Sequence, residues 1–141
     1  MKKQICVSLV ACILLTLVGC KQQADEAPPP AVTQNAFRIE YEFSMLSNDC
    51  VGNDWKTTVT YREQPIQSGD IITDPPGTTI VLCGTVTESD RFPDTGSGCV
   101  HLTLGEDTSG AIEITVQENR GRYAGNTAVW RFQYRITQNS E

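Results

Sequence analysis

Apolar and polar residues alternate along most of the chain after residue 36. From Phe37 to Met45 the odd-numbered side chains are apolar and the even-numbered ones are polar. This period of two is typical of a β-strand that buries one face. Five further segments repeat it, with apolar positions at Val59 and Tyr61; Ile80, Leu82 and Val86; Val100, Leu102 and Leu104; Ile112, Ile114 and Val116; and Trp130, Phe132, Tyr134 and Ile136. Within the segment of Ile80, Leu82 and Val86, Gly84 predicts a bulge.

Turn-forming residues separate these segments, and no window has a helical stripe. The turns are rich in Gly, Pro, Asp and Ser and lie at 68–70, 74–77, 94–98, 109–110 and 125–126. Short antiparallel strands with one apolar face each bury those faces by stacking as two sheets. The pattern therefore predicts an all-β domain over residues 36–141, a two-sheet antiparallel β-sandwich of six to eight strands, with a small β-barrel as the alternative. We expect the aromatic residues of the first and last strands to lie in the core.

The first twenty residues have the features of an export signal. Lys2 and Lys3 precede an apolar run from Ile5 to Val18, which is too short to span a bilayer of roughly 30 Å as a helix. The run ends in Leu17-Val18-Gly19-Cys20, which resembles the lipobox of bacterial lipoproteins. The alternatives are an ordinary signal peptide or an N-terminal transmembrane anchor.

The lipobox resemblance implies where the chain is cut and where it is held. It implies that residues 1–19 are a cleaved signal peptide and that Cys20 carries acyl chains such as palmitate. Two or three such chains give a stable membrane anchor in the cell envelope. Lys21, rather than an aspartate, follows the cysteine. In a cell with two membranes the resemblance therefore implies the outer membrane. The domain would lie either on its periplasmic face or at the cell surface.

Residues 20–35 predict a tether between the anchor and the domain. The segment has no apolar period, and Pro28, Pro29 and Pro30 favour an extended conformation. At about 3.1 Å per residue, residues 21–35 could hold the domain up to roughly 45 Å from the membrane.

Net charge narrows the range of partners. The chain carries a formal charge of −6, and loss of Lys2 and Lys3 with the signal leaves −8. Such an acidic protein lacks the basic surface that nucleic acid binding requires. We therefore expect no nucleic acid partner.

Three cysteines besides Cys20 remain after removal of the signal, and we expect two of them to pair in an oxidising compartment. The loop holding Cys50 and the loop running into Cys99 fall at one end of a sandwich, whereas Cys83 lies in mid-strand. The prediction is a Cys50–Cys99 disulfide with Cys83 buried and unreactive.

No catalytic motif stands out, so we do not expect an enzyme. His101 is the sole histidine and falls on the predicted outward face of a strand. The chain has neither a nucleophile-elbow pattern nor a glycine-rich phosphate loop.

Strand alternation places the loops of residues 47–56, 88–98 and 118–127 at the same end of the sandwich. Acidic side chains converging from separate loops are what Ca²⁺ requires, so Asp54, Glu88, Asp90 and Asp94 are the candidate ligands of a Ca²⁺ ion. A candidate binding surface on the same loops comprises Asn53, Trp55, Arg120, Arg122 and Tyr123. The alternative to a metal is an ion network in which Arg120 or Arg122 pairs with Asp54, Asp90 or Asp94.

A resemblance supports the calcium hypothesis. Residues 78–98, and especially Val86-Thr87-Glu88-Ser89-Asp90-Arg91-Phe92-Pro93-Asp94, are similar to the second calcium loop of the calcium-dependent phospholipid-binding (C-two) domains. The resemblance implies a β-sandwich whose acidic loops hold a Ca²⁺ ion at one end. We expect no other cofactor.

These observations favour an interaction module, because binding residues concentrate on loops carried by a rigid scaffold. We expect a membrane-anchored domain that presents its loops to an envelope protein or glycan. The alternative function is an envelope inhibitor that blocks a cationic enzyme or toxin with its acidic surface.

Overall fold

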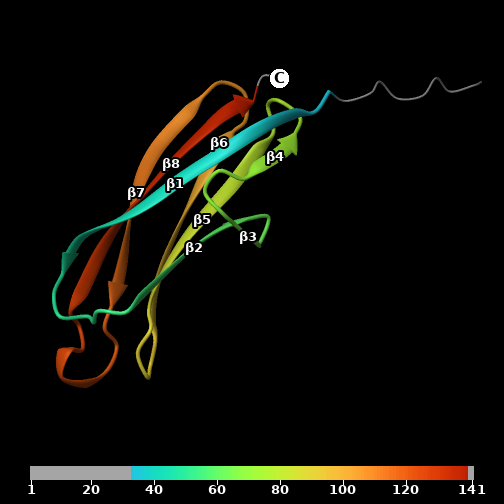
Figure 1. Ribbon diagram of the computed structural model, residues 1–141. Coiled ribbons are helices and arrows are strands. Elements are labelled where there is room, and N and C mark those ends of the chain that lie inside the picture. Colours follow the sequence, from blue (N-terminus) through green and yellow to red (C-terminus); the bar gives the residue numbers. More distant parts are fainter. Residues whose placement is uncertain (1–32, 140–141) are drawn as a thin grey trace, which may run out of the picture. The chain divides into compact units, whose positions relative to one another are not determined.

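The computed structural model describes residues 33–139, which form two four-stranded antiparallel sheets (Figure 1). Sheet 1 has the strand order β4-β1-β8-β7, and sheet 2 has the order β3-β2-β5-β6. The two sheets do not close into a barrel, so the β-sandwich prediction is confirmed. The strands are β1 (Asn35–Asn48), β2 (Trp55–Tyr61), β3 (Gln64–Ile66), β4 (Ile71–Asp74), β5 (Thr79–Glu88), β6 (Asp94–Thr103), β7 (Thr108–Gln117) and β8 (Thr127–Asn139), with one short 3₁₀ turn, η1 (Gly121–Tyr123).

Six of these strands match the alternating segments, and the sequence pattern missed β3 and β4. β3 has only three residues, and its central residue, Pro65, is unfavourable in a strand interior. β4 has four residues and ends where Pro75 begins a turn. Both strands lie at sheet edges, where a short segment pairs on one side only.

The core lies between the sheets and follows the predicted alternation. Phe37 and Ile39 of β1 and Phe132 of β8 are fully buried, as are inward residues of sheet 2 such as Val59 and Leu82. Burial of such side chains is the main favourable term in folding, about 1.5–3 kcal/mol for each. The expectation that aromatic residues of the first and last strands lie in the core is confirmed for Phe37 and Phe132.

Inward-facing glycines let the two sheets approach each other. A Cβ at Gly84 would lie 3.0 Å from the Phe132 ring, and a Cβ at Gly98 would lie 2.8 Å from Ile112. The predicted bulge at Gly84 is wrong, because β5 pairs with β2 and β6 in unbroken register through this residue. Gly84 instead leaves room for the aromatic ring of the opposite sheet.

The one register shift between β1 and β8 lies at the end of β1, between Met45 and Ser47. It breaks the alternation there, because a bulge re-aims the side chains that follow it. Leu46, which has no partner on β8, is 45% exposed. Met45, the last residue before the shift, is 40% exposed, although the alternation predicted an inward Met45.

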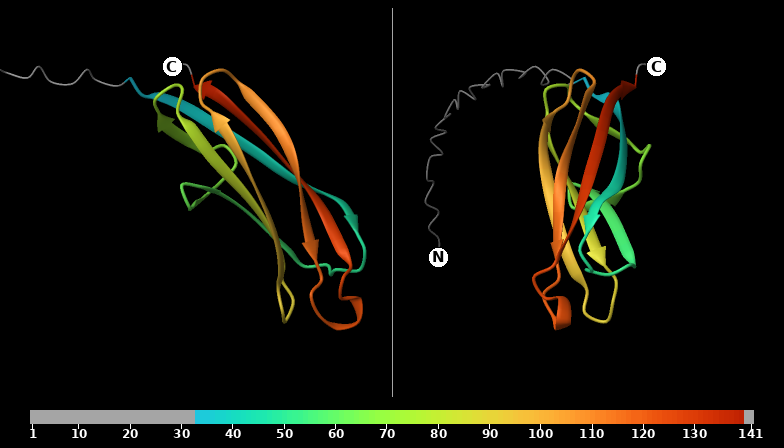
Figure 2. Two further views of the ribbon diagram at one scale, coloured as in Figure 1. Left: turned by 180° about the vertical axis from the view of Figure 1, so that it is seen from behind. Right: turned by 90° about the vertical axis from the view of Figure 1, so that its left-hand side faces the viewer.

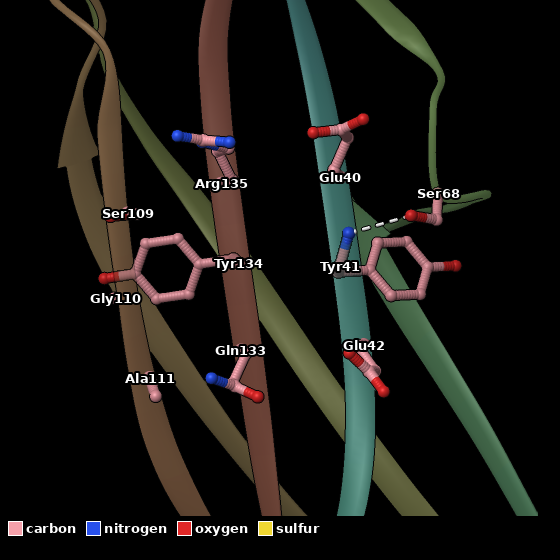
Figure 3. Close-up of a pocket in the computed structure, with 10 residues that line it drawn as sticks. All are labelled: Glu40, Tyr41, Glu42, Ser68, Ser109, Gly110, Ala111, Gln133, Tyr134 and Arg135. Atoms are coloured by element: carbon pink, nitrogen blue, oxygen red, sulfur yellow. Dashed lines mark hydrogen bonds between the residues drawn. The ribbon is translucent and has the colours of Figure 1, made fainter.

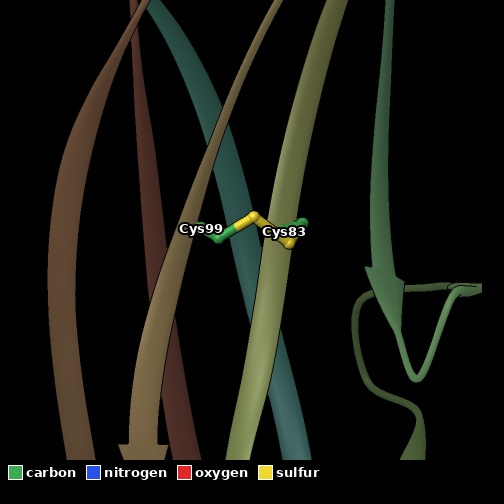
Figure 4. The surroundings of a disulfide bond; sticks show 2 residues. All are labelled: Cys83 and Cys99. Carbon is green, nitrogen blue, oxygen red and sulfur yellow. A yellow bond between two sulfur atoms is a disulfide. The ribbon is translucent and has the colours of Figure 1, made fainter.

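The disulfide joins Cys83 to Cys99, and the predicted Cys50–Cys99 pair is wrong (Figure 4). Cys83 of β5 and Cys99 of β6 are direct cross-strand partners, with their Cα atoms 4.1 Å apart. Both alternate with buried residues, so they point outward from sheet 2; Cys83 is half-buried and Cys99 is exposed. Cys50 is an exposed free thiol. The expectation of a buried Cys83 is wrong. It paired cysteines whose loops lie at the same end of the sandwich, whereas the register of the β5–β6 hairpin decides which cysteines lie opposite each other.

The ends of the strands define two poles of the domain (Figures 1 and 2). At one pole the connections β1–β2, β5–β6 and β7–β8 lie together; we call residues 49–54, 89–93 and 118–126 the loop end. At the other pole β1 begins at Asn35 opposite Asp74, and Leu104 exchanges backbone hydrogen bonds with the 75–78 turn. We call this the entry pole, because the chain enters the described domain there.

Candidate functional site

Backbone hydrogen bonds tie the loop end together. The N–H of Asp49 donates to the carbonyl of Thr127 at 2.9 Å, and the N–H of Ser89 donates to the carbonyl of Asp54 at 2.7 Å. The side-chain amide of Asn119 reaches Asp94 at 2.7 Å. Segments as far apart in sequence as Asp49 and Thr127 are therefore in direct contact, which confirms the predicted convergence of the three loops.

The β1–β2 loop is shaped by Asn48 and Gly52. The Asn48 side chain accepts from the N–H of Val51 at 2.9 Å and donates to the carbonyl of Gly52 at 2.7 Å, and Val51 is buried beneath the loop. Gly52 has φ +136°, a conformation that L side chains rarely adopt. A Cβ there would also overlap the carboxyl group of Glu88. Glycine thus allows this loop to close over Glu88.

Glu88 and Asp94 are buried acidic residues at the base of the β5–β6 turn. They are cross-strand partners and are only 3% and 5% exposed. The Glu88 carboxylate accepts from the N–H of Asp90 at 3.1 Å. Burial raises the pKa of Glu88, and the negative charges of Asp90, Glu118 and Asp94 raise it further, against the opposing effect of the Asp90 hydrogen bond. The carboxylate form of Glu88 is therefore less favourable here than in an exposed glutamate.

Asp94 is held by hydrogen bonds from Asn119. Asn119 donates to its two carboxylate oxygens from the side-chain amide, at 2.7 Å, and from the backbone N–H, at 3.4 Å. The same side-chain amide also donates to the carbonyl of Gln117. These contacts fix the β7–β8 loop against the end of β6.

The proposed calcium ligands do not form a metal site in this arrangement. Within residues 33–139, no group of three or more Asp, Glu, His or Cys side chains lies close enough to hold a metal ion. Glu88 and Asp94 point inward, whereas Asp54 and Asp90 are exposed. Asp90 accepts from the N–H of Phe92 at 2.5 Å within the turn. Calcium binding stays a prediction, and it would require these side chains to move.

The predicted ion network at the loop end is wrong. The one ion pair in the described part of the chain joins Arg62 to Asp74, away from these loops. The loop-end arginines instead lie against aromatic rings: the guanidinium carbon of Arg120 is 4.8 Å from the Phe92 ring centroid, and that of Arg122 is 5.6 Å from the Tyr123 centroid. Such cation–π contacts are worth about 0.5–1 kcal/mol at exposed sites.

A pocket opens between the β5–β6 turn and the β7–β8 loop, with a volume of about 340 Å³. Phe92, at its rim, is 49% exposed, and the guanidinium carbon of Arg91 lies 5.4 Å from its ring centroid. We call this the tip pocket; it is lined by Arg91, Phe92, Pro93, Asp94, Asn119 and Arg120. Two guanidinium groups thus flank one exposed ring, and neither has a carboxylate within 4 Å among residues 33–139.

The predicted binding surface is brought together only in part. Asn53, Arg120, Arg122 and Tyr123 are exposed at the loop end, and Tyr123 is 46% exposed. Trp55 is instead half-buried between the sheets, where its ring centroid lies 5.4 Å from that of Trp130. Each of these two indole N–H groups is buried without an acceptor in the described part of the chain. Trp55 therefore contributes to the interior rather than to the surface.

Sequence reasoning missed Arg91, Phe92 and Asn119 as parts of the site. The available signal was Phe92 itself, an aromatic residue inside a turn and outside the alternation. Such a residue has no strand to carry it into the core, so it remains exposed. Asn119 gave no signal, because its partner Asp94 is distant in sequence and its role depends on the fold.

A second, shallower hollow lies on the outer face of sheet 1 (Figure 3). Its volume is about 720 Å³, and it forms where the small residues Ser109, Gly110 and Ala111 of β7 lie beside longer polar side chains on β8 and β1. Glu40 and Arg135 are cross-strand partners there. The Tyr134 ring extends toward Gly110, where a Cβ would overlap its hydroxyl group. The hollow is thus the open face of a sheet with mixed charges.

His101 lies where the sequence predicted, exposed on the outer face of sheet 2. Cys20 and the tether of residues 20–35 lie almost wholly outside the described residues, which begin at residue 33. Within residues 33–139, no helix has the length and apolar character needed to cross a bilayer.

Comparisons of the chain with protein-family models, with curated proteins and with solved structures give no match.

Proposed function

We propose that this protein is a lipid-anchored envelope lipoprotein whose β-sandwich is a binding module, with the loop end as its binding surface. One observation carries the proposal: three loops from distant parts of the chain converge at the pole opposite the point where the chain enters the domain. Because the tether would join the domain at the entry pole, it would leave the loop end clear of the point of attachment.

The exposed side chains of the loop end support a binding role. Four of the six large hydrophobic residues that are exposed in the described domain lie at or beside it: Met45, Leu46, Phe92 and Tyr123. Arg91, Arg120 and Arg122 are interspersed with them. Aromatic residues and arginine are the types enriched at recognition surfaces.

The anchor is tested by replacing its acceptor residue. We expect Cys20→Ala to abolish incorporation of a labelled fatty acid and to remove the protein from the membrane fraction of the source bacterium. Cys12→Ala, which changes a cysteine inside the signal, is the matched control and should leave both unchanged. Labelling that survives Cys20→Ala would refute the lipid anchor.

The binding surface is tested by photo-crosslinking in intact cells. A photoreactive residue is placed at Asn53 or Tyr123 of the loop end, and at Thr79 or Glu106 of the entry pole in matched variants of the full chain. All four positions are exposed. We expect a discrete adduct from positions 53 and 123 alone. Equal adducts from both poles, or adducts from the entry pole alone, would refute the loop end as the binding surface.

A further inference from the structure

The tip pocket contains two guanidinium groups, and neither forms an ion pair with a carboxylate of residues 33–139. Arg91 and Arg120 lie within 5.4 Å of the same Phe92 ring centroid. Asp94, the one acid in the lining, is only 5% exposed and is already bonded by Asn119. Two like charges held near each other repel, and an anion between them lowers the energy of both.

The shape of an arginine side chain selects the kind of anion. The planar guanidinium presents paired N–H donors whose spacing matches the two oxygens of a carboxylate. Two guanidinium groups at one pocket can therefore hold a carboxylate from both sides. The remaining lining decides what the carboxylate belongs to.

The exposed Phe92 ring and the polar walls fit a sugar better than a peptide. A pyranose ring can lay its C–H groups on the negative face of an aromatic ring, while its hydroxyl groups bond to polar side chains. Phe92 and Pro93 are the only apolar residues in the lining, which leaves little apolar surface for the side chains of a peptide. The volume of about 340 Å³ is at the small end of ligand pockets, roughly 300–1,000 Å³.

We propose that the tip pocket binds an acidic saccharide, with Arg91 and Arg120 on its carboxylate and the Phe92 ring against its sugar ring. The proposal rests on the proposed function, because it names the ligand class of the loop end. The domain has no general attraction for anions, because its excess of acidic residues repels them. An anion is attracted only where guanidinium groups are concentrated.

The test is a calorimetric titration of the full lipidated chain in detergent with trigalacturonic acid. Its methyl ester is the matched control ligand, because it keeps the sugar rings and removes the charge. A hexaglutamate peptide is the second control ligand, because it carries carboxylates without sugar rings. We expect binding of the acid alone, weakened about tenfold by Arg120→Gln or Arg91→Gln and reduced by Phe92→Leu. Arg135→Gln, in the hollow of sheet 1, should leave the affinity unchanged.

Each other outcome overturns the proposal. No binding of trigalacturonic acid, equal binding of its ester, or equal binding of hexaglutamate would show that an acidic sugar is not the ligand class. Equal losses from Arg135→Gln would place the binding outside the tip pocket. If these titrations fail while crosslinks still form only at positions 53 and 123, the saccharide is wrong and the binding surface stands.

Discussion

At the residue scale, the β2–β3 turn places two ordinary side chains in a glycine-like conformation. Arg62 and Glu63 have φ of +50° and +62°, and they connect Tyr61 to Gln64 in a two-residue hairpin. Positive φ at both central positions is the pattern of a type I′ turn, which favours Asn-Gly. Arg62 offsets part of this cost through its 2.5 Å ion pair with Asp74, whereas Glu63 has no such contact in the described structure.

We therefore predict that Glu63→Gly raises the free energy of unfolding by about 0.5–1 kcal/mol, because it relieves a conformation unfavourable to residues with a Cβ. Chemical denaturation measures it. Glu106→Gly is the control, at a position without positive φ, and should lower stability because glycine gains more freedom on unfolding. A loss of stability in Glu63→Gly would contradict the turn conformation.

Tyr61 makes a second residue-scale prediction. Its hydroxyl group donates to Asp74, and its pKa is raised to about 12 by burial first and by Asp74 second, while Arg62 opposes the shift. Because the folded state favours the neutral phenol, this contribution to stability is complete below pH 10 and is lost as pH rises from 10 toward 12.

We expect Tyr61→Phe to lower the free energy of unfolding at pH 7 and to reduce its decline above pH 10, measured by urea unfolding. Tyr123→Phe should keep the wild-type pH profile; an unchanged profile in Tyr61→Phe would contradict the assignment.

At the element scale, the β5–β6 hairpin determines which cysteines pair. Because Glu88 stands opposite Asp94, equal steps back from the turn place Cys83 opposite Cys99. We predict that Cys83→Ser/Cys99→Ser lowers the free energy of unfolding by about 2–3 kcal/mol, the usual effect of a bridge closing a loop of this length. Cys50→Ser should leave it unchanged. Peptide mapping that finds Cys50 in a bridge would contradict the structure.

The elements that the sequence predicted are those whose alternation decides their burial. Phe37 and Phe132 could be assigned to the core because their neighbours in sequence alternate with them. β3 and β4 could not be predicted, because three or four residues beside Pro65 and Pro75 do not establish a period. The contact of Arg120 with Phe92 was equally inaccessible, since it depends on how two loops from different hairpins meet. Convergence of loops was predictable; which side chains face outward within them was not.

At the scale of the whole molecule, the loop end closes over a buried carboxyl group. Burial raises the pKa of Glu88 above its ordinary value of 4.5, so the folded state is stabilised by the proton at acid pH and loses that contribution as pH rises through the raised pKa. We predict that Glu88→Gln melts at a higher temperature than wild type at pH 7 and that this difference vanishes as pH approaches 4.5.

Calcium binding, which the acidic spacing predicts, has a different signature. Millimolar Ca²⁺ would raise the melting temperature of the wild type by mass action, and Glu88→Gln or Asp94→Asn would remove the increase. Arg135→Gln, outside the loop end, would retain it. A melting temperature that is the same in Ca²⁺ and in chelator would eliminate the calcium hypothesis.

Three loops distant in sequence form one surface at the pole opposite the chain's entry, and a probe on Cys50 can detect this arrangement in solution. This free, exposed thiol lies in the first of the three loops, so a nitroxide attached to it in the otherwise unmodified protein reports on its neighbours by nuclear magnetic resonance. We expect strong line broadening of backbone amides in residues 89–93 and 118–126 and none in residues 75–78 and 104–107. Broadening at the second pair of segments, or none at the first, would contradict it.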